Sequence, residues 1–88
     1  MNTNQATKII QRPYITEKTF ALIEKDARIC FIVDLQASKS LIKEAIKTLY
    51  EEDAVDINTA RTINGKKAFV KFETVEKARD LATKIGML

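Results

Sequence analysis

Arg28-Ile29-Cys30-Phe31-Ile32-Val33 is the stretch of the sequence that decides the fold. It is short, rich in residues that favour β-strands, and apolar on both of its alternating faces, which predicts a strand. A strand that is apolar on both faces belongs in the middle of a sheet with other layers above and below it. The stretch therefore predicts the central strand of a sheet whose two faces are covered by helices.

The segments on either side supply the other layers. Residues 1–7 are expected to form a flexible tail, and residues 8–11 a short first strand that ends before Pro13. A first helix is predicted over residues 17–25, where Thr16 can cap its start. A second is predicted over residues 39–50, which follow Ser38 and carry apolar residues at helical spacing.

The C-terminal third of the chain predicts a hairpin and a last helix. Residues 55–63 and 66–72 read as strands, and Asn64-Gly65 between them is a strong hairpin signal because both central residues of that turn need a positive φ. Thr74 can cap a helix over residues 75–85, and Gly86 is placed to end it. The expected order is β-α-β-α-β-β-α. We expect one α+β domain over residues 1–88, a three-layer α/β/α sandwich around a four-stranded antiparallel sheet.

Composition argues against an enzyme or a metalloprotein. The chain has no histidine, only two glycines and therefore no glycine-rich phosphate loop, and a single cysteine, Cys30, which is expected to be buried and inert. The acidic run of Glu51, Glu52, Asp53 and Asp56 could in principle bind a hard cation, but such runs are more often solvated. We expect no catalytic residue, cofactor, metal or small-molecule substrate.

The lone cysteine and the polar N-terminus bear on location. One thiol cannot form an internal disulfide, which fits a reducing compartment. The N-terminus lacks the apolar core of a signal peptide, and no apolar run approaches the roughly 20 residues that span a bilayer. We therefore expect a cytoplasmic protein without a membrane partner.

Basic residues are grouped in a way that indicates RNA binding. The net charge is only +3, but no acid lies between Ile57 and Phe72, a segment that carries four basic residues. More basic residues lie at the start of the second helix and in the segment Arg12-Pro13-Tyr14-Ile15-Thr16-Glu17-Lys18, here called the corner, where Pro13 turns the chain. On one face these groups would form a footprint for RNA phosphates, with nearby amide and hydroxyl groups as hydrogen-bond partners; alternatively, the lysines only keep strand edges soluble. The candidate RNA-binding residues are Arg12, Lys18, Lys39, Lys43, Asn58, Thr59, Arg61, Lys66 and Lys67.

Four segments in order resemble the universal large-subunit ribosomal protein 23 family. The corner resembles its Pro-x-x-(Ser/Thr)-Glu-Lys signature, and residues 37–43 resemble the start of its second helix. Val55-Asp56-Ile57-Asn58-Thr59 resembles its third strand, and Lys66-Lys67-Ala68-Phe69-Val70 its return strand. The order and spacing match from about Lys8 to Leu88.

The resemblance implies a role and a set of partners. It implies a structural protein of the large ribosomal subunit that binds large-subunit rRNA at the rim of the polypeptide exit tunnel, beside ribosomal protein 29, and is a monomer outside the ribosome. Glu17 matches the family position where factors that meet the nascent chain dock. Bacterial members carry a long basic extension where this chain has only Asn64-Gly65. The short hairpin resembles the archaeal branch and favours signal recognition particle over trigger factor as the transient partner.

Three other readings remain open on the residues alone. A free RNA-binding module would stack bases on exposed aromatic residues of an open sheet, for which Phe31, Phe69 and Phe72 are candidates. A small protein-interaction domain would use the edge of the sheet and bind no RNA. A small acid-anhydride hydrolase would need the glycine-rich anion loop that the chain lacks.

Overall fold

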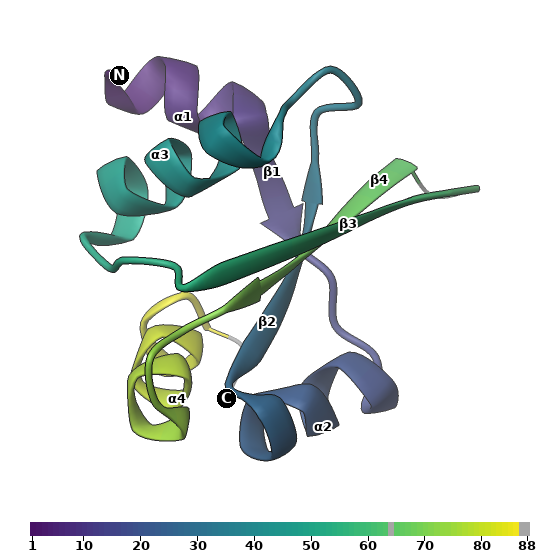
Figure 1. The fold of residues 1–88 in the computed structure, drawn as a ribbon, viewed down its shortest axis with the longest axis vertical. Helices are drawn as coiled ribbons and strands as arrows, with labels where there is room; N and C mark the ends of the chain where they lie inside the picture. The colour runs from purple at the N-terminus through teal and green to yellow at the C-terminus, as the bar shows by residue number, and fades with distance from the viewer. Residues whose placement is uncertain (64, 87–88) are drawn as a thin grey trace.

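The computed structural model describes residues 1–63 and 65–86 and has the element order α1-β1-α2-β2-α3-β3-β4-α4 (Figure 1). The α+β class and the four-stranded antiparallel sheet are confirmed. No helix in the described part of the chain is both long and apolar enough to cross a bilayer. The helices are α1 (Thr3–Ile9), α2 (Glu17–Asp26), α3 (Lys39–Tyr50) and α4 (Val75–Lys84), and the strands are β1 (Ile10–Pro13), β2 (Arg28–Val33), β3 (Asp56–Thr62) and β4 (Gly65–Lys71).

Strand β2 lies inside the sheet, as its sequence predicts. The strand order is β1-β2-β4-β3, and every pairing is antiparallel. Residues that are directly opposite in such a pair project from the same face of the sheet. The register places Phe31 opposite Ala68 and Ile29 opposite Val70, which is also opposite Ile57. These apolar residues define one side of the sheet, called the core face here.

The core face carries the main hydrophobic cluster. Buried residues of all four helices join it, among them Ala6 of α1, Ile23 of α2, Ile46 of α3 and Leu81 of α4. The helices lie in two neighbouring pairs, α1 with α3 and α2 with α4 (Figure 1). The ring of Phe31 at the centre of the sheet is fully buried. Residues of every helix belong to this one cluster. The expected three-layer sandwich, with helices on both faces of the sheet, is therefore not confirmed.

The opposite side of the sheet is here called the open face. Cys30 and Ile32 are buried on it, but neither belongs to the main cluster. Accessibility increases towards the β3 edge: Cys30 of β2 is buried, Phe69 of β4 is half-buried, and Asn58 of β3 is exposed. The register assigns to this face the side chains of Arg12, Arg28, Asp56, Asn58, Ala60, Lys67, Phe69 and Lys71.

The prediction of a flexible N-terminal tail is wrong. Residues 3–9 form α1, so the first strand begins at Ile10 rather than at residue 8. Asn2 and Gln5 cap this helix reciprocally: the Gln5 backbone N–H donates to Asn2 Oδ1 over 2.9 Å, and the Asn2 backbone N–H donates to Gln5 Oε1 over 3.1 Å. Ala6, with no exposed surface, packs into the core. A capped helix with one small buried residue has no apolar stripe, and the sequence pattern therefore missed it.

The predicted helix starts are confirmed. Thr16, Ser38 and Thr74 each accept a hydrogen bond from a backbone N–H in the first turn of the helix that follows. Gly86, which was placed as the end of the last helix, follows the C-cap residue Ile85 with a φ of 83°. Asn64 of the predicted turn lies outside the described residues, whereas Gly65 has the positive φ, 111°, that such a turn requires.

Replacing Glu51 with glycine is expected to stabilise the domain. Glu51 ends α3 in the left-handed region with a φ of 59°, which disfavours any residue with a Cβ. The gain in the free energy of unfolding is expected to be about 0.5–1 kcal/mol after the greater flexibility of glycine in the unfolded chain is subtracted. Urea denaturation measures it. Glu52→Gly is the control: Glu52 has no positive φ, so this change should lower stability. A loss of stability for Glu51→Gly would contradict the account.

Candidate nucleic-acid interface

The β3–β4 hairpin brings basic residues beside the start of α3. Arg61 and Lys66 are directly opposite each other on the core face, beyond the apolar centre of the sheet. The Lys66 ammonium donates a hydrogen bond of 2.6 Å to the carbonyl oxygen of Ala37, just before α3. This bond ties the hairpin to the loop that leads into the helix, so the cations of the two segments are held near one another.

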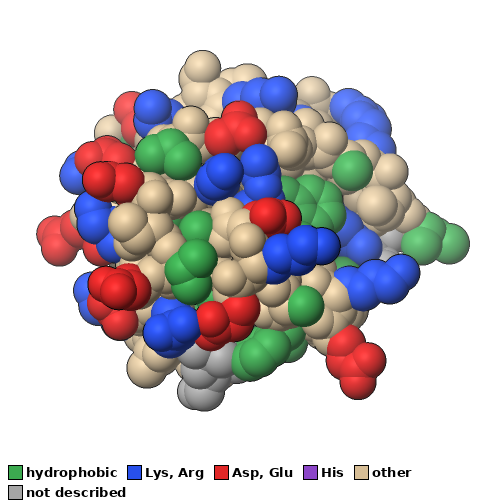
Figure 2. All heavy atoms as spheres, turned by 60° about the horizontal axis from the view of Figure 1, so that its bottom comes forward, with side chains coloured by type: hydrophobic (Ala, Val, Ile, Leu, Met, Phe, Trp, Pro, Cys, Tyr) green, Lys and Arg blue, Asp and Glu red, His purple; other side chains and the backbone are tan. Residues whose placement is uncertain are grey.

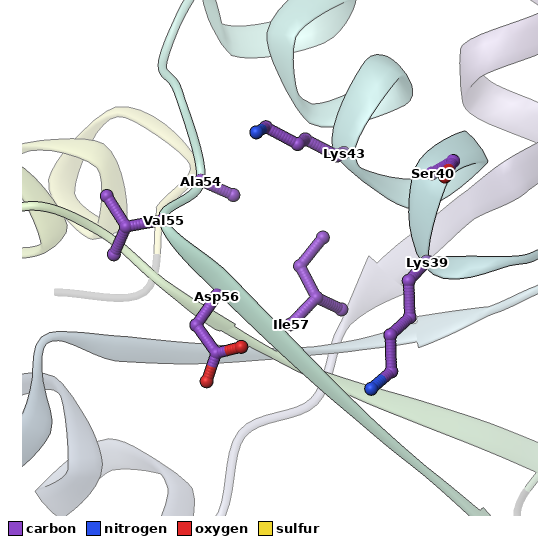
Figure 3. Close-up of a pocket in the computed structure, with 7 residues that line it drawn as sticks. All are labelled: Lys39, Ser40, Lys43, Ala54, Val55, Asp56 and Ile57. Carbon is purple, nitrogen blue, oxygen red and sulfur yellow. The ribbon is translucent and has the colours of Figure 1, made fainter.

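Two lysines of α3 flank an open hollow of about 200 Å³, whose other wall is formed by residues 54–57. Lys39 and Lys43 are one helical turn apart and project from the same side of α3. In Figure 3 the Lys39 side chain runs toward the strand beside Ile57, and the Lys43 side chain extends toward Ala54. The two ammonium groups thus lie on either side of the hollow. We call Lys39, Lys43, Thr59, Arg61 and Lys66 the α3–hairpin strip.

The corner is fixed against the open face. The Tyr14 backbone N–H donates to the Cys30 carbonyl over 2.9 Å, and the buried Thr19 hydroxyl donates to the Tyr14 carbonyl over 2.9 Å. The Lys67 ammonium lies 4.0 Å from the centre of the Tyr14 ring, within range of a cation–π interaction. The corner is therefore anchored to two strands, and Glu17 and Lys18 in the first turn of α2 are exposed beside it.

The acid on the open face is already paired. Arg28 forms a salt bridge with Asp56 at 3.0 Å and also donates to the Phe69 carbonyl oxygen at 3.3 Å. The hydrogen bond from Arg28 lowers the pKa of the Asp56 carboxyl, which stays ionised and neutralised by its partner. The remaining charged side chains of this face are therefore basic: Arg12, Lys67 and Lys71.

The nine predicted RNA contacts fall into two groups rather than on one face. Asn58 and Thr59 are neighbours in β3, and Lys66 and Lys67 are neighbours in β4, so each pair is divided between the two sides of the sheet. The open face and the adjoining first turn of α2 carry Arg12, Lys18, Asn58 and Lys67, while the α3–hairpin strip carries the rest. Lys71 was not among the candidates; it lies two residues from Phe69 and four from Lys67, and this even spacing along the strand is the sequence signal that places it on the open face.

Most of the candidate cations form no salt bridge with another residue that the structure describes. Among residues 1–63 and 65–86, five of them form neither a salt bridge nor a side-chain hydrogen bond: Arg12, Lys18, Lys39, Lys43 and Arg61. By contrast, Arg79 of α4 pairs with Glu24 at 2.6 Å and Lys77 with Glu73 at 2.9 Å. Figure 2 shows acidic side chains mainly toward the left of the view, and Lys and Arg around an apolar area toward the right. Unpaired cations can bind an anionic partner without first breaking an internal contact.

The described residues do not favour a metal site or a reactive thiol. No group of three or more histidine, cysteine, aspartate or glutamate residues that could hold a metal ion occurs in the described ranges. Of the acidic run, Asp53 contacts Lys47 at 3.6 Å and Asp56 is held by Arg28. Cys30 is buried, as expected, and burial raises the pKa of its thiol to about 11, which makes the reactive thiolate scarce at neutral pH.

Comparison with known proteins gives consistent matches along the chain. The family description "Ribosomal protein L23" matches residues 8–84. "Large ribosomal subunit protein uL23" of the archaeon Methanobrevibacter smithii is 45% identical over 80 residues, which cover 90% of this chain and 93% of that protein. The protein of the same name from Methanococcus vannielii is 39% identical over 83 residues, covering 93% and 96%. "Large ribosomal subunit protein uL23B" of Schizosaccharomyces pombe is 48% identical over 82 residues, which cover 92% of this chain but only 58% of that longer protein.

Proposed function

Because the chain belongs to the ribosomal protein L23 family, we propose that it is a structural protein of the large ribosomal subunit and binds large-subunit rRNA. It is a structural component rather than an enzyme, and the large subunit works in the cytoplasm, where the sequence led us to expect it. The observation that carries RNA binding is the set of unpaired cations around the corner, α3 and the β3–β4 hairpin. No other function is favoured by a feature of comparable weight.

The geometry supports binding on both sides of the hairpin. Lys39 and Lys43 flank a hollow, where each ammonium group can contact a phosphate of an RNA backbone, and the exposed guanidinium of Arg61 can donate two parallel hydrogen bonds to phosphate oxygens. Contacts of this kind fix position without reading sequence. Each releases counterions from the RNA, so binding should weaken steeply as salt rises.

We further propose that the protein lies at the rim of the polypeptide exit tunnel, beside ribosomal protein 29. Glu17, on the anchored corner, would then face the factors that meet the nascent chain, with signal recognition particle as the partner. Glu17 supports this role because its carboxylate is exposed and forms no salt bridge among the described residues. An accessible acid without a salt-bridge partner among the described residues suits a transient contact with a basic partner.

The ribosomal role is tested by co-sedimentation. Tagged protein produced in the organism that encodes it is expected to travel with large subunits in a sucrose gradient and to stay there at moderate salt. Protein at the top of the gradient, or with small subunits only, would contradict the role.

Changing Glu17 to alanine is expected to weaken the docking of signal recognition particle to ribosomes about 5- to 10-fold, while incorporation into large subunits stays near the unmodified level. The reason is that a charged contact at an interface is worth roughly 1 kcal/mol or more when it is accessible to its partner. Filter binding of the particle to purified large subunits measures the loss. Glu76→Ala removes another exposed first-turn glutamate, that of α4, and serves as the matched control. Equal effects of the two changes, or a parallel loss of incorporation, would show that Glu17 acts only on its helix.

A further inference from the structure

The open face contains a groove with an accessible aromatic ring. The groove, of about 730 Å³, is lined on its apolar side by Tyr14, Leu22 and Phe69. Phe31 and Phe72 are at most 1% exposed and belong to the core cluster, whereas Phe69 is half-buried and lies outside that cluster. Of these three sheet-region phenylalanines, Phe69 is therefore the one that a ligand can reach. The volume lies within the roughly 300–1,000 Å³ typical of ligand sites.

The walls of the groove are held in place without a ligand. Tyr14 is anchored through its backbone to Cys30 and Thr19, and the Lys67 ammonium lies over its ring. Phe69 lies in β4 between Cys30 of β2 and Asn58 of β3 in one row across the sheet. The exposed amide of Asn58 is thus next to the ring, where it can donate and accept hydrogen bonds.

The charge around the groove selects an anionic occupant. Arg12 and Lys67 are both opposite Ile32 of β2, and Lys71 is two residues from Phe69 on the same face. Asp56, the acid of this face, is neutralised by Arg28. Glu17 and Lys18, which also line the groove, contribute one charge of each sign. A flat apolar group that carries phosphates on either side fits these features, and an unpaired nucleotide of RNA has this composition.

We propose that this groove takes one unpaired base of the rRNA, stacked on Phe69, with Asn58 beside the edge of the base and Arg12, Lys67 and Lys71 near the flanking phosphates. The inference rests on the proposed binding of rRNA and adds the kind of RNA element that is bound there. The α3–hairpin strip provides phosphate contacts alone, whereas the open face recognises a base that has left the helical stack. Stacking of this kind tolerates any base.

Replacing Phe69 with leucine tests the stacking contact. The change keeps an apolar side chain at a half-buried position, so the fold should persist, as circular dichroism would verify. Affinity for large-subunit rRNA extracted from the same organism is expected to fall about 10-fold at fixed salt, while the salt dependence stays unchanged because the cations that contact phosphates are all retained. Phe20→Leu, on the 38% exposed phenylalanine of α2, is the matched control and should bind as the unmodified protein does.

A fluorescent variant gives a readout independent of affinity. The chain has no tryptophan, so Phe69→Trp introduces a single reporter that retains a stacking ring. Its emission should be quenched when the extracted rRNA binds, while that of Phe20→Trp should change little. Unchanged affinity of Phe69→Leu together with unquenched Phe69→Trp would overturn the stacking site and leave rRNA binding intact. Quenching by a purified ribosomal protein but not by rRNA would assign the groove to a protein partner and also overturn it. Failure of the unmodified protein to bind rRNA would overturn the proposed function itself.

Discussion

Replacing Lys39, Lys43 and Arg61 together with glutamine is expected to weaken binding to large-subunit rRNA about 100-fold at roughly 0.1 M salt. None of the three side chains forms a salt bridge or a side-chain hydrogen bond in the described part of the chain, so their replacement removes only the longer-range attraction between Lys39 and Asp56. All three project from the α3–hairpin strip, where an RNA backbone can contact them together. The plot of log affinity against log salt should become shallower by about 0.7–0.9 for each phosphate that no longer has a basic partner.

A second triple variant tests whether the position of the three charges, rather than their number, determines the affinity for RNA. Glutamine at Lys25, Lys77 and Lys84 removes three positive charges from exposed positions on α2 and α4, away from the hairpin. Of these, Lys77 also loses its exposed salt bridge with Glu73, a kind of pair that contributes little to stability. This variant should retain most of the affinity and nearly the full salt dependence. Equal reductions in affinity for the two triple variants would mean that net charge, rather than the α3–hairpin strip, attracts the RNA.

Replacing Phe31 with alanine is expected to lower the free energy of unfolding by about 3–5 kcal/mol. Phe31 has no exposed surface, lies in the central strand, and stacks on Tyr50 of α3 with ring centres 6.0 Å apart. A small domain has only about 5–15 kcal/mol of stability in total, so the variant should be close to unfolding. Urea denaturation followed by circular dichroism measures the change.

Phe20→Ala is the control for this destabilisation. Phe20 is partly exposed on α2, and its removal should cost less than about 1 kcal/mol. At a temperature where Phe31→Ala is still folded, its affinity for rRNA should match that of the unmodified protein, because Phe31 lies on the core face and contacts no RNA in this account. A small change in stability at Phe31 would contradict its place at the centre of the core.

Apolar patterning and cap residues predicted most of the fold. The apolar stretch of β2 identified the central strand, because burial on both faces leaves no alternation of polar residues. Thr16, Ser38 and Thr74 identified three helix starts because their hydroxyl groups satisfy backbone N–H groups that the helix leaves free. Helix α1 was missed because Ala6 is its one fully buried residue and its start is fixed by a reciprocal cap, so its sequence shows no apolar stripe.

The sequence predicted which residues belong to the candidate site, but not how they are arranged in space. Alternation along a strand shows that Lys66 and Lys67 point to opposite faces, but the bond from Lys66 to the Ala37 carbonyl depends on the path of a distant loop. Lys66 is therefore partly a structural residue: reversing its charge would break a partly buried hydrogen bond as well as remove a cation. A double change of Lys66 and Lys67 to glutamate should accordingly lower both the stability of the fold and the affinity for RNA. Changes at Lys39, Lys43 and Arg61 should lower the affinity for RNA alone.

The most direct test of the central claim, that the hairpin and the start of α3 hold the protein on rRNA, is lysine acetylation measured by mass spectrometry. The reaction is carried out on intact large subunits and on the free protein. The account predicts that the exposed Lys39 and Lys43 react readily in the free protein and are protected in the subunit, whereas Lys25, Lys77 and Lys84 remain reactive in both. Protection of the α2 and α4 lysines, with Lys39 and Lys43 still reactive in the subunit, would contradict it.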